Sequence, residues 1–447
     1  MRTFTLLALP ICLLASVAEA QIPTASELRR VGLERVWASQ ARVDPGSDKV
    51  AHVTVDERNC YVQATNGSLT AFDAERGNRK WTVQLGPANR TTFPATSNAS
   101  TVVVVTGTTI FGVDKFSGNV EWTLQTPSSA TTSATATDRF FYIGTNDGSV
   151  YCYRFDVVEY LGRTGRLPGT YNPTTRTVSS PIDDVASTSA WAWRYRSGRM
   201  MQKPPVLVGG KAVFGDFRGD VYVLTTGTRQ ELGGKLTMQH KAGHGLAGNI
   251  AARDNSVFVP TTDNRVVAVS VKKSVREGVE TPAGTSLWSF GVGHSISGGP
   301  DLIGDRLYVG STGEGLLALD PIDGSQIPSP TGEWWIPGAS SLIGVTESLV
   351  LASGSQNTII AADRATGRPR GMVRLDAYPI RVTNTLNDRI YMASEQGLVI
   401  CCRQPGSDEP TFYRDLDKAL ITPEMAEETK EDRPELVEGA EDGGDSQ

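Results

Sequence analysis

The sequence predicts an all-β fold, an eight-bladed β-propeller built from four-stranded antiparallel blades. Three observations lead to this prediction. One strand pattern recurs eight times along the 447 residues, a turn of the form D-x-x-x-G follows several copies, and a tryptophan often follows the turn. Units of about 40 residues with such a pattern are typical of propellers.

The recurring strand is recognised from the residue that ends it. Four positions before that residue every copy has Leu, Ile or Val, and two positions before it nearly every copy has a small residue. The positions between them are mostly apolar too, so we expect neighbouring sheets to cover both faces of the strand. The final residues are Asp73, Asp114, Arg154, Thr225, Ser270, Asp320, Asp363 and Arg403, with steps of 41, 40, 71, 45, 50, 43 and 40 residues.

Segments on either side of this strand complete each unit. A β-rich segment precedes each copy, and a turn with Gly, Asn or Asp separates the two, which indicates a hairpin. In AFDAERGNRKW (Ala71–Trp81) and GVDKFSGNVEW (Gly112–Trp122), the aspartate can accept backbone hydrogen bonds and the glycine can take a positive φ. The tryptophan then begins an outer strand, where a large ring can fill the widening wedge between blades.

The last unit lacks an outer strand of its own, because little strand-like sequence follows Arg403. The segment LERVWASQARV (Leu33–Val43) carries Trp37 as the first blade carries Trp81. We therefore predict that this N-terminal segment closes the eighth blade and protects an edge that would otherwise pair with other chains.

The two ends of the chain differ from the propeller in composition. Residues 1–20 have a basic Arg2, a short apolar stretch and a small-x-small site at Ala18–Ala20, so they predict a cleavable signal peptide and a periplasmic or secreted protein. The propeller then spans residues 21–414. Residues 415–447 contain twelve acids and three bases, which predicts a disordered tail that is either solubilising or an acidic docking element.

Two long excursions interrupt the regular repeat. One lies at Val157–Ser189 and is rich in turn-forming residues and poor in core residues, and the other lies near Lys272–Thr285. On a rigid propeller, such segments are either binding elements or tolerated surface loops.

The phrases SLTAFDAERGNRKWTVQ (Ser68–Gln84) and TIFGVDKFSGNVEWTLQ (Thr109–Gln125) resemble the pyrroloquinoline-quinone-type propeller repeat. The resemblance covers essentially the whole chain between the signal peptide and the tail. Two groups share this repeat: quinone- and calcium-dependent dehydrogenases of alcohols and sugars, and the BamB family of noncatalytic propellers that support outer-membrane protein assembly. The repeat identifies the fold, whereas function depends on the sites built on it.

Cys401 and Cys402 are the strongest feature in favour of an enzyme, because quinoprotein alcohol dehydrogenases have a disulfide between adjacent cysteines. However, Cys401 occupies the small-residue position of the repeat, as Cys152 does, and adjacent strand residues point to opposite faces. We therefore expect no bond between them, while a long-range bridge of Cys60 stays open.

Other catalytic chemistry cannot be assigned. His240 and His244 lie in loop-like sequence rather than on a helix that would direct both rings to zinc. No catalytic base, calcium ligands or quinone walls can be assigned, so we expect no cofactor and no metal. The alternative is a dehydrogenase that binds pyrroloquinoline quinone with calcium.

The preferred interpretation is a noncatalytic exported scaffold, similar to the BamB family. We expect a monomer that joins a complex with envelope or outer-membrane assembly proteins. The propeller itself is close to neutral without the acidic tail, so nothing indicates the clustered basic face of a nucleic-acid-binding protein. No apolar run after the signal peptide is long enough for a membrane helix.

The BamB family is similar in presenting partner-binding loops between blades, one with a Leu-Arg-Gly segment and one with two aspartates separated by one residue. By repeat register these loops correspond to HGLAGNIAAR (His244–Arg253) and GHSISGGPDL (Gly293–Leu302). The predicted partner-binding residues are Leu246, Gly248, Ser295 and Ser297.

Both loops depart from the family pattern. Ala247 stands where the arginine would be, and Ser295 and Ser297 replace the two acids. We expect Leu246 to act as an apolar anchor beside backbone groups that can bond an added strand. The alternative is that these loops only connect blades.

Overall fold

The structure, a computed structural model, describes residues 22–413 except 168–170, 173–176, 179–181, 184–189, 229–230, 232, 277–278, 298 and 331. The predicted signal peptide and the acidic tail lie outside the described residues, as does Cys12.

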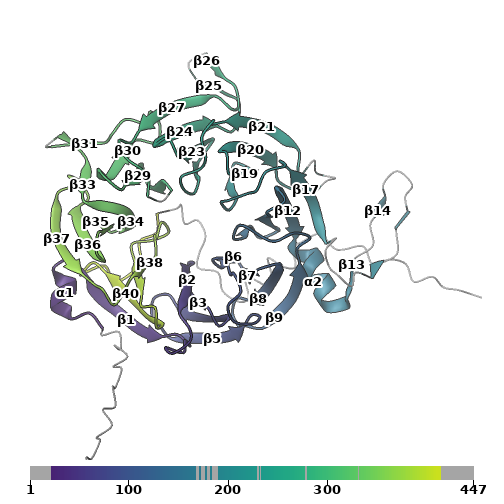
Figure 1. Ribbon diagram of the computed structural model, residues 1–447, viewed down its shortest axis with the longest axis horizontal. Helices are drawn as coiled ribbons and strands as arrows, with labels where there is room; N and C mark the ends of the chain where they lie inside the picture. The colour runs from purple at the N-terminus through teal and green to yellow at the C-terminus, as the bar shows by residue number, and fades with distance from the viewer. Residues whose placement is uncertain are drawn as a thin grey trace, which may run out of the picture.

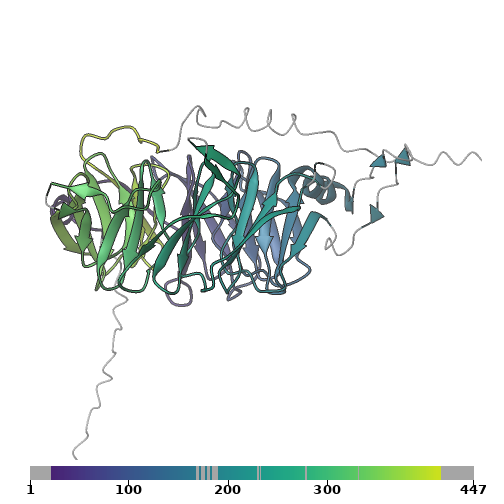
Figure 2. The same ribbon diagram turned by 90° about the horizontal axis from the view of Figure 1, so that it is seen from above.

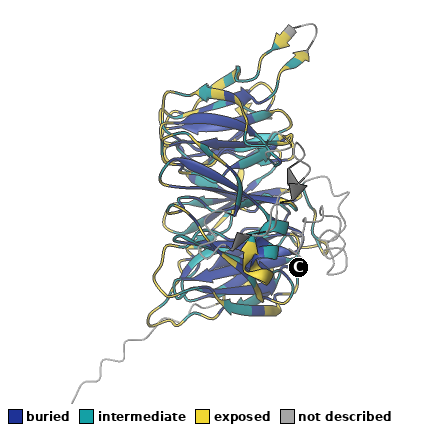
Figure 3. Ribbon diagram, turned by 90° about the vertical axis from the view of Figure 1, so that its right-hand side faces the viewer, coloured by how far each residue is buried: buried dark blue, intermediate teal, exposed yellow. Residues whose placement is uncertain are grey.

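Eight four-stranded antiparallel sheets stand around a central axis and form a closed ring (Figures 1 and 2). The predicted all-β, eight-bladed propeller is therefore confirmed. Buried residues run through every blade, and exposed residues gather at the turns and the outer rim (Figure 3). The described residues contain no helix that is long and apolar enough to cross a membrane.

The first four blades follow chain order, with the innermost strand first. Blade 1 is β2 (Val50–Val55), β3 (Asn59–Ala64), β4 (Ser68–Asp73) and β5 (Arg79–Gln84). Blade 2 is β6 (Thr96–Ser97), β7 (Thr101–Thr106), β8 (Thr109–Asp114) and β9 (Val120–Gln125). Blade 3 is β10 (Thr135–Ala136), β11 (Phe140–Gly144), β12 (Ser149–Arg154) and β17 (Trp191–Arg196). Blade 4 is β18 (Val206–Val208), β19 (Lys211–Gly215), β20 (Asp220–Thr225) and β21 (Leu236–Lys241).

The remaining blades complete the ring. Blade 5 is β22 (Ala251–Arg253), β23 (Ser256–Thr261), β24 (Arg265–Ser270) and β27 (Ser286–Gly291). Blade 6 is β28 (Asp301–Ile303), β29 (Arg306–Ser311), β30 (Gly315–Leu319) and β33 (Trp335–Pro337). Blade 7 is β34 (Ala339–Val345), β35 (Leu349–Gly354), β36 (Thr358–Asp363) and β37 (Pro369–Arg374). Blade 8 is β38 (Ile380–Arg381), β39 (Ile390–Ala393), β40 (Leu398–Arg403) and β1 (Glu34–Gln40).

The N-terminal segment closes the ring as predicted. Strand β1 pairs antiparallel with β40, and Trp37 lies opposite Cys401. Before it, helix α1 (Ala25–Arg29) begins with a capping box in which Thr24 and Glu27 satisfy each other's backbone N–H groups. Leu28 in this helix and Leu33 after it are buried against blades 7 and 8, so the segment anchors two blades at once.

The recurring turn and tryptophan join most blades to the next. The indole N–H of Trp37 donates to the carbonyl of Ala74 at 2.8 Å, and that of Trp81 donates to the carbonyl of Lys115 at 3.0 Å. Both carbonyls directly follow the turn aspartate of the neighbouring blade. A Cβ atom built on Gly77 would lie 2.5 Å from Cδ2 of Trp37, so the ring needs a glycine beneath it. The repeat therefore provides the contact between neighbouring blades as well as the turn within each blade.

Three junctions lack this arrangement, and other groups replace it. Helix α2 (Phe155–Thr164) packs on Trp122, where a Cβ atom built on Gly162 would lie 2.7 Å from Cβ of Trp122. Met238 stands in the tryptophan position of blade 4 and contacts Gly284. Gly371 stands there in blade 7 and admits the backbone of Arg30.

We predict that Gly118→Ala destabilises the protein more than Gly107→Ala. Both glycines have positive φ values, 78° and 61°, so both substitutions meet left-handed strain. Only the Cβ atom at Gly118 would also meet a ring, at 2.6 Å from Cγ of Trp81, whereas Gly107 faces open space. The additional loss should be about 1–3 kcal/mol in the free energy of unfolding, measured by chemical denaturation. Equal losses for the two variants would contradict the docking role.

The four cysteines of the described chain are free and buried. Cys401 belongs to the apolar cluster around Trp37 and Tyr391, while Cys402 belongs to the cluster around Ile390 and Ile400. The two thiols thus lie on opposite faces of β40, as the strand geometry predicts.

The two excursions extend from the outer rim (Figure 1). The first begins with α2, and its later residues include two short hairpins, β13 (Arg166–Leu167) with β16 (Ile182–Asp183) and β14 (Tyr171–Asn172) with β15 (Thr177–Val178). The second forms a hairpin of β25 (Ser274–Arg276) and β26 (Val279–Thr281), in which Val275 is 63% exposed. A further short pair, β31 (Pro328–Ser329) and β32 (Gly332–Glu333), precedes β33.

Candidate functional site

The linkers between consecutive blades and the turns between second and third strands lie on one face of the ring. We call this face the linker face. It carries both loops that the sequence analysis selected, because each loop joins the outer strand of one blade to the inner strand of the next.

The first predicted linker places Leu246 inside the propeller. Leu246 forms an isolated antiparallel bridge with Thr261 and is 6% exposed. A Cβ atom built on Gly215 of blade 4 would lie 2.6 Å from Cδ1 of Leu246, so the side chain fills the space that this glycine leaves. Gly248 is buried as well. The Leu246 side chain therefore belongs to the core between blades 4 and 5, and a partner would meet this linker through its neighbouring residues.

The second linker repeats this arrangement. Ile296 bridges Ser311 and is buried, while Ser295 on one side is exposed. Ser297 on the other side is half-buried, and its hydroxyl donates to the carbonyl of Ser340 in blade 7. Of the four predicted residues, Ser295 alone is fully exposed.

The structure brings the two linkers into contact. A Cβ atom built on Gly299 in the second linker would lie 2.5 Å from the carbonyl oxygen of Asn249 in the first. His244, which begins the first predicted segment, is exposed and lies 3.6 Å from a carboxylate oxygen of Asp263. The two linkers therefore form one continuous surface over blades 4 to 6.

Sequence reasoning missed an exposed apolar pair beside this surface. Met200 lies in the linker before blade 4 and Phe217 lies in the turn between β19 and β20; they are 38% and 43% exposed. The backbone N–H of Phe217 donates to the carbonyl of Met200 at 3.2 Å, so the two residues are adjacent. A signal existed in the sequence, because the other seven blades have Asn, Gly, Thr, Ser or Glu where blade 4 has Phe217.

The turn that carries Phe217 is held rigidly. Asp216 is buried, and its carboxylate accepts hydrogen bonds from the backbone N–H groups of Arg218 and Asp220. It also accepts from the hydroxyl of Tyr222 at 3.1 Å, and burial followed by the charge of Asp216 raises the pKa of that phenol. These hydrogen bonds fix the conformation of the turn that carries Phe217.

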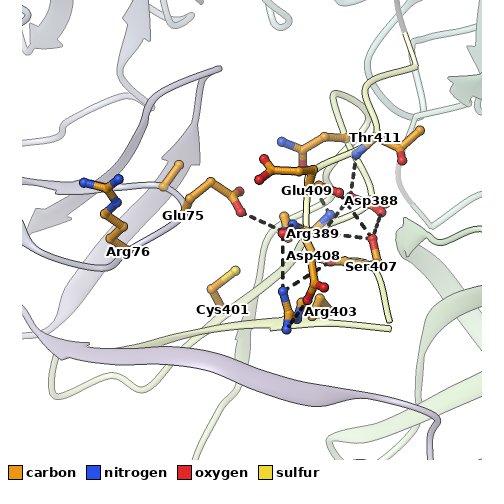
Figure 4. A network of polar contacts seen from close by, with 12 residues as sticks. Glu75, Arg76, Asp388, Arg389, Cys401, Arg403, Ser407, Asp408, Glu409 and Thr411 are labelled. Atoms are coloured by element: carbon orange, nitrogen blue, oxygen red, sulfur yellow. Dashed lines mark hydrogen bonds and ion pairs between the residues drawn. The ribbon is translucent and has the colours of Figure 1, made fainter. Parts of the chain in front are cut away.

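On the opposite face, a network of polar contacts holds the segment that follows β40 (Figure 4). Residues 404–413, which we call the C-terminal strap, follow β40 and return across blade 8. Phe412 bridges Asn387, and the hydroxyl of Tyr413 donates to the carbonyl of Val345. The described chain ends there, on the side away from the linker face.

Arg389 fastens the strap and has no exposed side-chain surface. Its guanidinium donates to Glu75 of blade 1 and to Asp388, both at 3.0 Å. It also donates to the hydroxyl of Ser407 at 3.2 Å and to the carbonyl of Asp408 at 3.0 Å (Figure 4). Each of these donors is used within the protein, which indicates a structural clamp rather than a ligand site.

The two histidines considered in the sequence analysis lie on separate elements. His240 lies on β21 and bonds the carbonyl of Gly284 at 3.1 Å through Nδ1, while His244 lies on the linker. Within the described ranges, no group of three or more His, Cys, Asp or Glu side chains gathers in a way that could hold an ion.

Comparison with known proteins agrees with this architecture. No curated protein matches the chain. Among solved structures, the computationally designed Ika8 protein is 14% identical, has a TM-score of 0.57, and aligns over 81% of this chain and 98% of its own. BamB from Moraxella catarrhalis is 13% identical, has a TM-score of 0.55, and aligns over 84% of this chain and 98% of its own. At such identities, these two likenesses concern the fold alone.

A family model gives the more specific match. It is described as outer membrane protein assembly factor BamB, and it matches residues 26–274 and 271–370, which is well over half of the chain. These residues include blades 1 to 6, most of blade 7, both predicted linkers and the Met200–Phe217 pair. The chain belongs to the family of the outer membrane protein assembly factor BamB.

Proposed function

We propose that this protein is a noncatalytic scaffold of the cell envelope that binds an outer-membrane assembly protein through its linker face. Membership of the BamB family supports the role, and the signal-like residues 1–20 support export to the periplasm. In this role the protein works without a cofactor and as one copy within a larger complex.

The observation that carries the proposal is the exposed Met200–Phe217 pair. An apolar pair on a rigid, otherwise polar turn surface is typical of the anchor of a protein interface. Arg218 extends this anchor, since its guanidinium carbon lies 5.8 Å from the centre of the Phe217 ring. The adjoining linkers, with exposed Ser295 and His244, provide a polar rim around it.

We expect photo-crosslinking residues at Phe217 and Ser295 to capture an outer-membrane assembly protein in the native host. A matched probe at Ile322 is the control, because Ile322 is 67% exposed but lies in the turn after β30, on the opposite face. The double change Met200→Ser and Phe217→Ser should weaken that association about tenfold or more, since the contact loses two apolar anchors. Capture from Ile322 or Val275 alone would refute the assignment of the linker face.

A further inference from the structure

A groove of about 550 Å³ opens between the outer strands of blades 5 and 6, beside the second predicted linker. Phe290 and Gly291 at the end of β27 form one side, and β33 forms the other. The side chains that matter for its chemistry are Phe290, Glu314, Leu317, Glu333, Trp335 and Pro337.

The apolar wall of the groove centres on Trp335, which is 45% exposed. Its neighbour Trp334 is buried, and the Trp334 indole N–H donates to the carbonyl of Arg364 in blade 7 at 2.9 Å. Because adjacent strand residues point to opposite faces, docking of Trp334 toward blade 7 turns Trp335 toward blade 5. Trp335 is opposite Leu317 in the strand pairing, and both line the groove.

Two carboxylate side chains also line the groove. Glu314 comes from the turn between β29 and β30, and it lies against the second linker at Gly293, where a Cβ atom would approach Oε1 to 2.2 Å. Glu333 comes from β32, directly before the two tryptophans. Neither carboxylate has an ion-pair partner in the part of the chain that the structure describes.

This placement adds a carboxylate to the second linker beside Gly293. Ser295 and Ser297 are uncharged, and Glu314 places its carboxylate against the same linker from the neighbouring turn. The absence of a Cβ atom at Gly293 makes this approach sterically feasible.

We propose that the groove binds a lysine or arginine side chain carried by an apolar segment of a partner protein. The inference rests on the proposed scaffold function and adds the chemistry of the segment that is recognised. A cation above the face of Trp335 is attracted by the ring, and Glu314 and Glu333 neutralise its charge. Phe290, Leu317 and Pro337 accept the apolar residues on either side of the cation.

The test uses the purified full chain and dye-labelled, end-blocked peptides of the sequence Leu-Leu-Arg-Leu-Leu. Fluorescence anisotropy should show binding that weakens at least tenfold when citrulline replaces arginine, because citrulline keeps the shape and removes the charge. Raising the salt concentration should weaken binding of the arginine peptide alone.

Variants then locate the binding. We expect the double change Glu314→Gln and Glu333→Gln to weaken binding of the arginine peptide at least tenfold and to leave the weak binding of the citrulline peptide unchanged. Trp335→Ala should weaken binding of both peptides. Glu347→Gln and Met372→Ala are matched controls, since both residues are exposed and lie outside the groove. Thermal unfolding of each variant checks that the fold is intact.

Equal binding of both peptides, no measurable binding, or full binding by the double variant would overturn the proposal. These results are independent of the crosslinking experiment, because the peptides need no native partner. Crosslinks from Phe217 and Ser295 with no peptide selectivity would retain the scaffold function and reject the cationic groove. Peptide selectivity without such crosslinks would support the cationic groove and reject the proposed binding through the linker face.

Discussion

A chain that begins at residue 44 is expected to be strongly destabilised and to melt far below a chain that begins at residue 22. Leu28, Val31 and Leu33 are 1%, 1% and 0% exposed, and Trp37 is 7% exposed, all within the segment that would be removed. Burial of each such side chain stabilises a protein by about 1.5–3 kcal/mol. Their sum is comparable with the 5–15 kcal/mol by which native proteins are usually stable.

The loss is expected to exceed that sum, because two further contributions disappear with β1. Strand β40 would lose its outer partner and become the exposed edge of blade 8. The Trp37 indole would no longer bond the carbonyl of Ala74, so blade 8 would lose its attachment to blade 1. We therefore expect the shortened chain to melt at a much lower temperature and to aggregate.

Circular dichroism and size-exclusion chromatography measure this effect. A synthetic peptide of residues 22–43, added to the shortened chain, should raise its melting temperature progressively, with the logarithm of the peptide concentration once the site is mostly occupied. The control replaces residues 274–281, the exposed β25–β26 hairpin, by a short turn and should change stability by less than about 1 kcal/mol. A shortened chain that melts at the same temperature as the full one would disprove closure by β1.

The blades were predictable from sequence because their signal repeats. Apolar positions four residues before Asp73, Asp114 and the equivalent residues identify one strand per blade. Because the pattern occurs eight times, an irregular copy does not obscure the repeat. The closing strand was predictable for the same reason, since Trp37 follows the pattern of Trp81 and the eighth unit lacked an outer strand. Local sequence therefore determined the architecture.

The linker face was predictable in position but not in detail. The burial of Leu246 depends on Gly215, which lies in another blade, and the register of the linker does not reveal that contact. The general chemistry of turns does not distinguish Phe217, which stands out only when the eight turns are aligned position by position. The groove combines Phe290, Glu314 and Trp335 from three segments, so it exists only once blades 5 and 6 are packed.

Arg389→Met is expected to lower the free energy of unfolding by about 3–5 kcal/mol, because it leaves buried carboxylates without their cation. Asp388 is 3% exposed and Glu75 is two-thirds covered, and both accept hydrogen bonds from the Arg389 guanidinium. The methionine keeps most of the apolar volume, so the loss would report the charge and hydrogen bonds rather than a cavity. The strap should also become accessible to proteases near Ser407.

The pH dependence distinguishes this electrostatic loss from a general packing defect. Burial already raises the pKa of Glu75, and the Arg389 guanidinium opposes that rise. Without the guanidinium the pKa of Glu75 should rise further above its value in the unfolded chain. A group whose pKa is raised on folding destabilises the folded state above that pKa and ceases to do so once it is protonated. The difference between wild type and variant should therefore be largest near neutral pH and shrink toward about pH 5.

Arg370→Met provides the matched control. Arg370 also pairs with a carboxylate, Asp363, but its side chain is 65% exposed, so the pair contributes at most about 1 kcal/mol. Urea denaturation of the wild type and both variants at pH 5 and pH 7.5 gives the comparison. If Arg389→Met costs no more than Arg370→Met, or if its cost is the same at both pH values, the strap is not fastened by the buried charges of Asp388, Arg389 and Glu75. Its attachment would then depend on the Asn387–Phe412 bridge and the Tyr413 hydroxyl, which the substitution leaves unchanged.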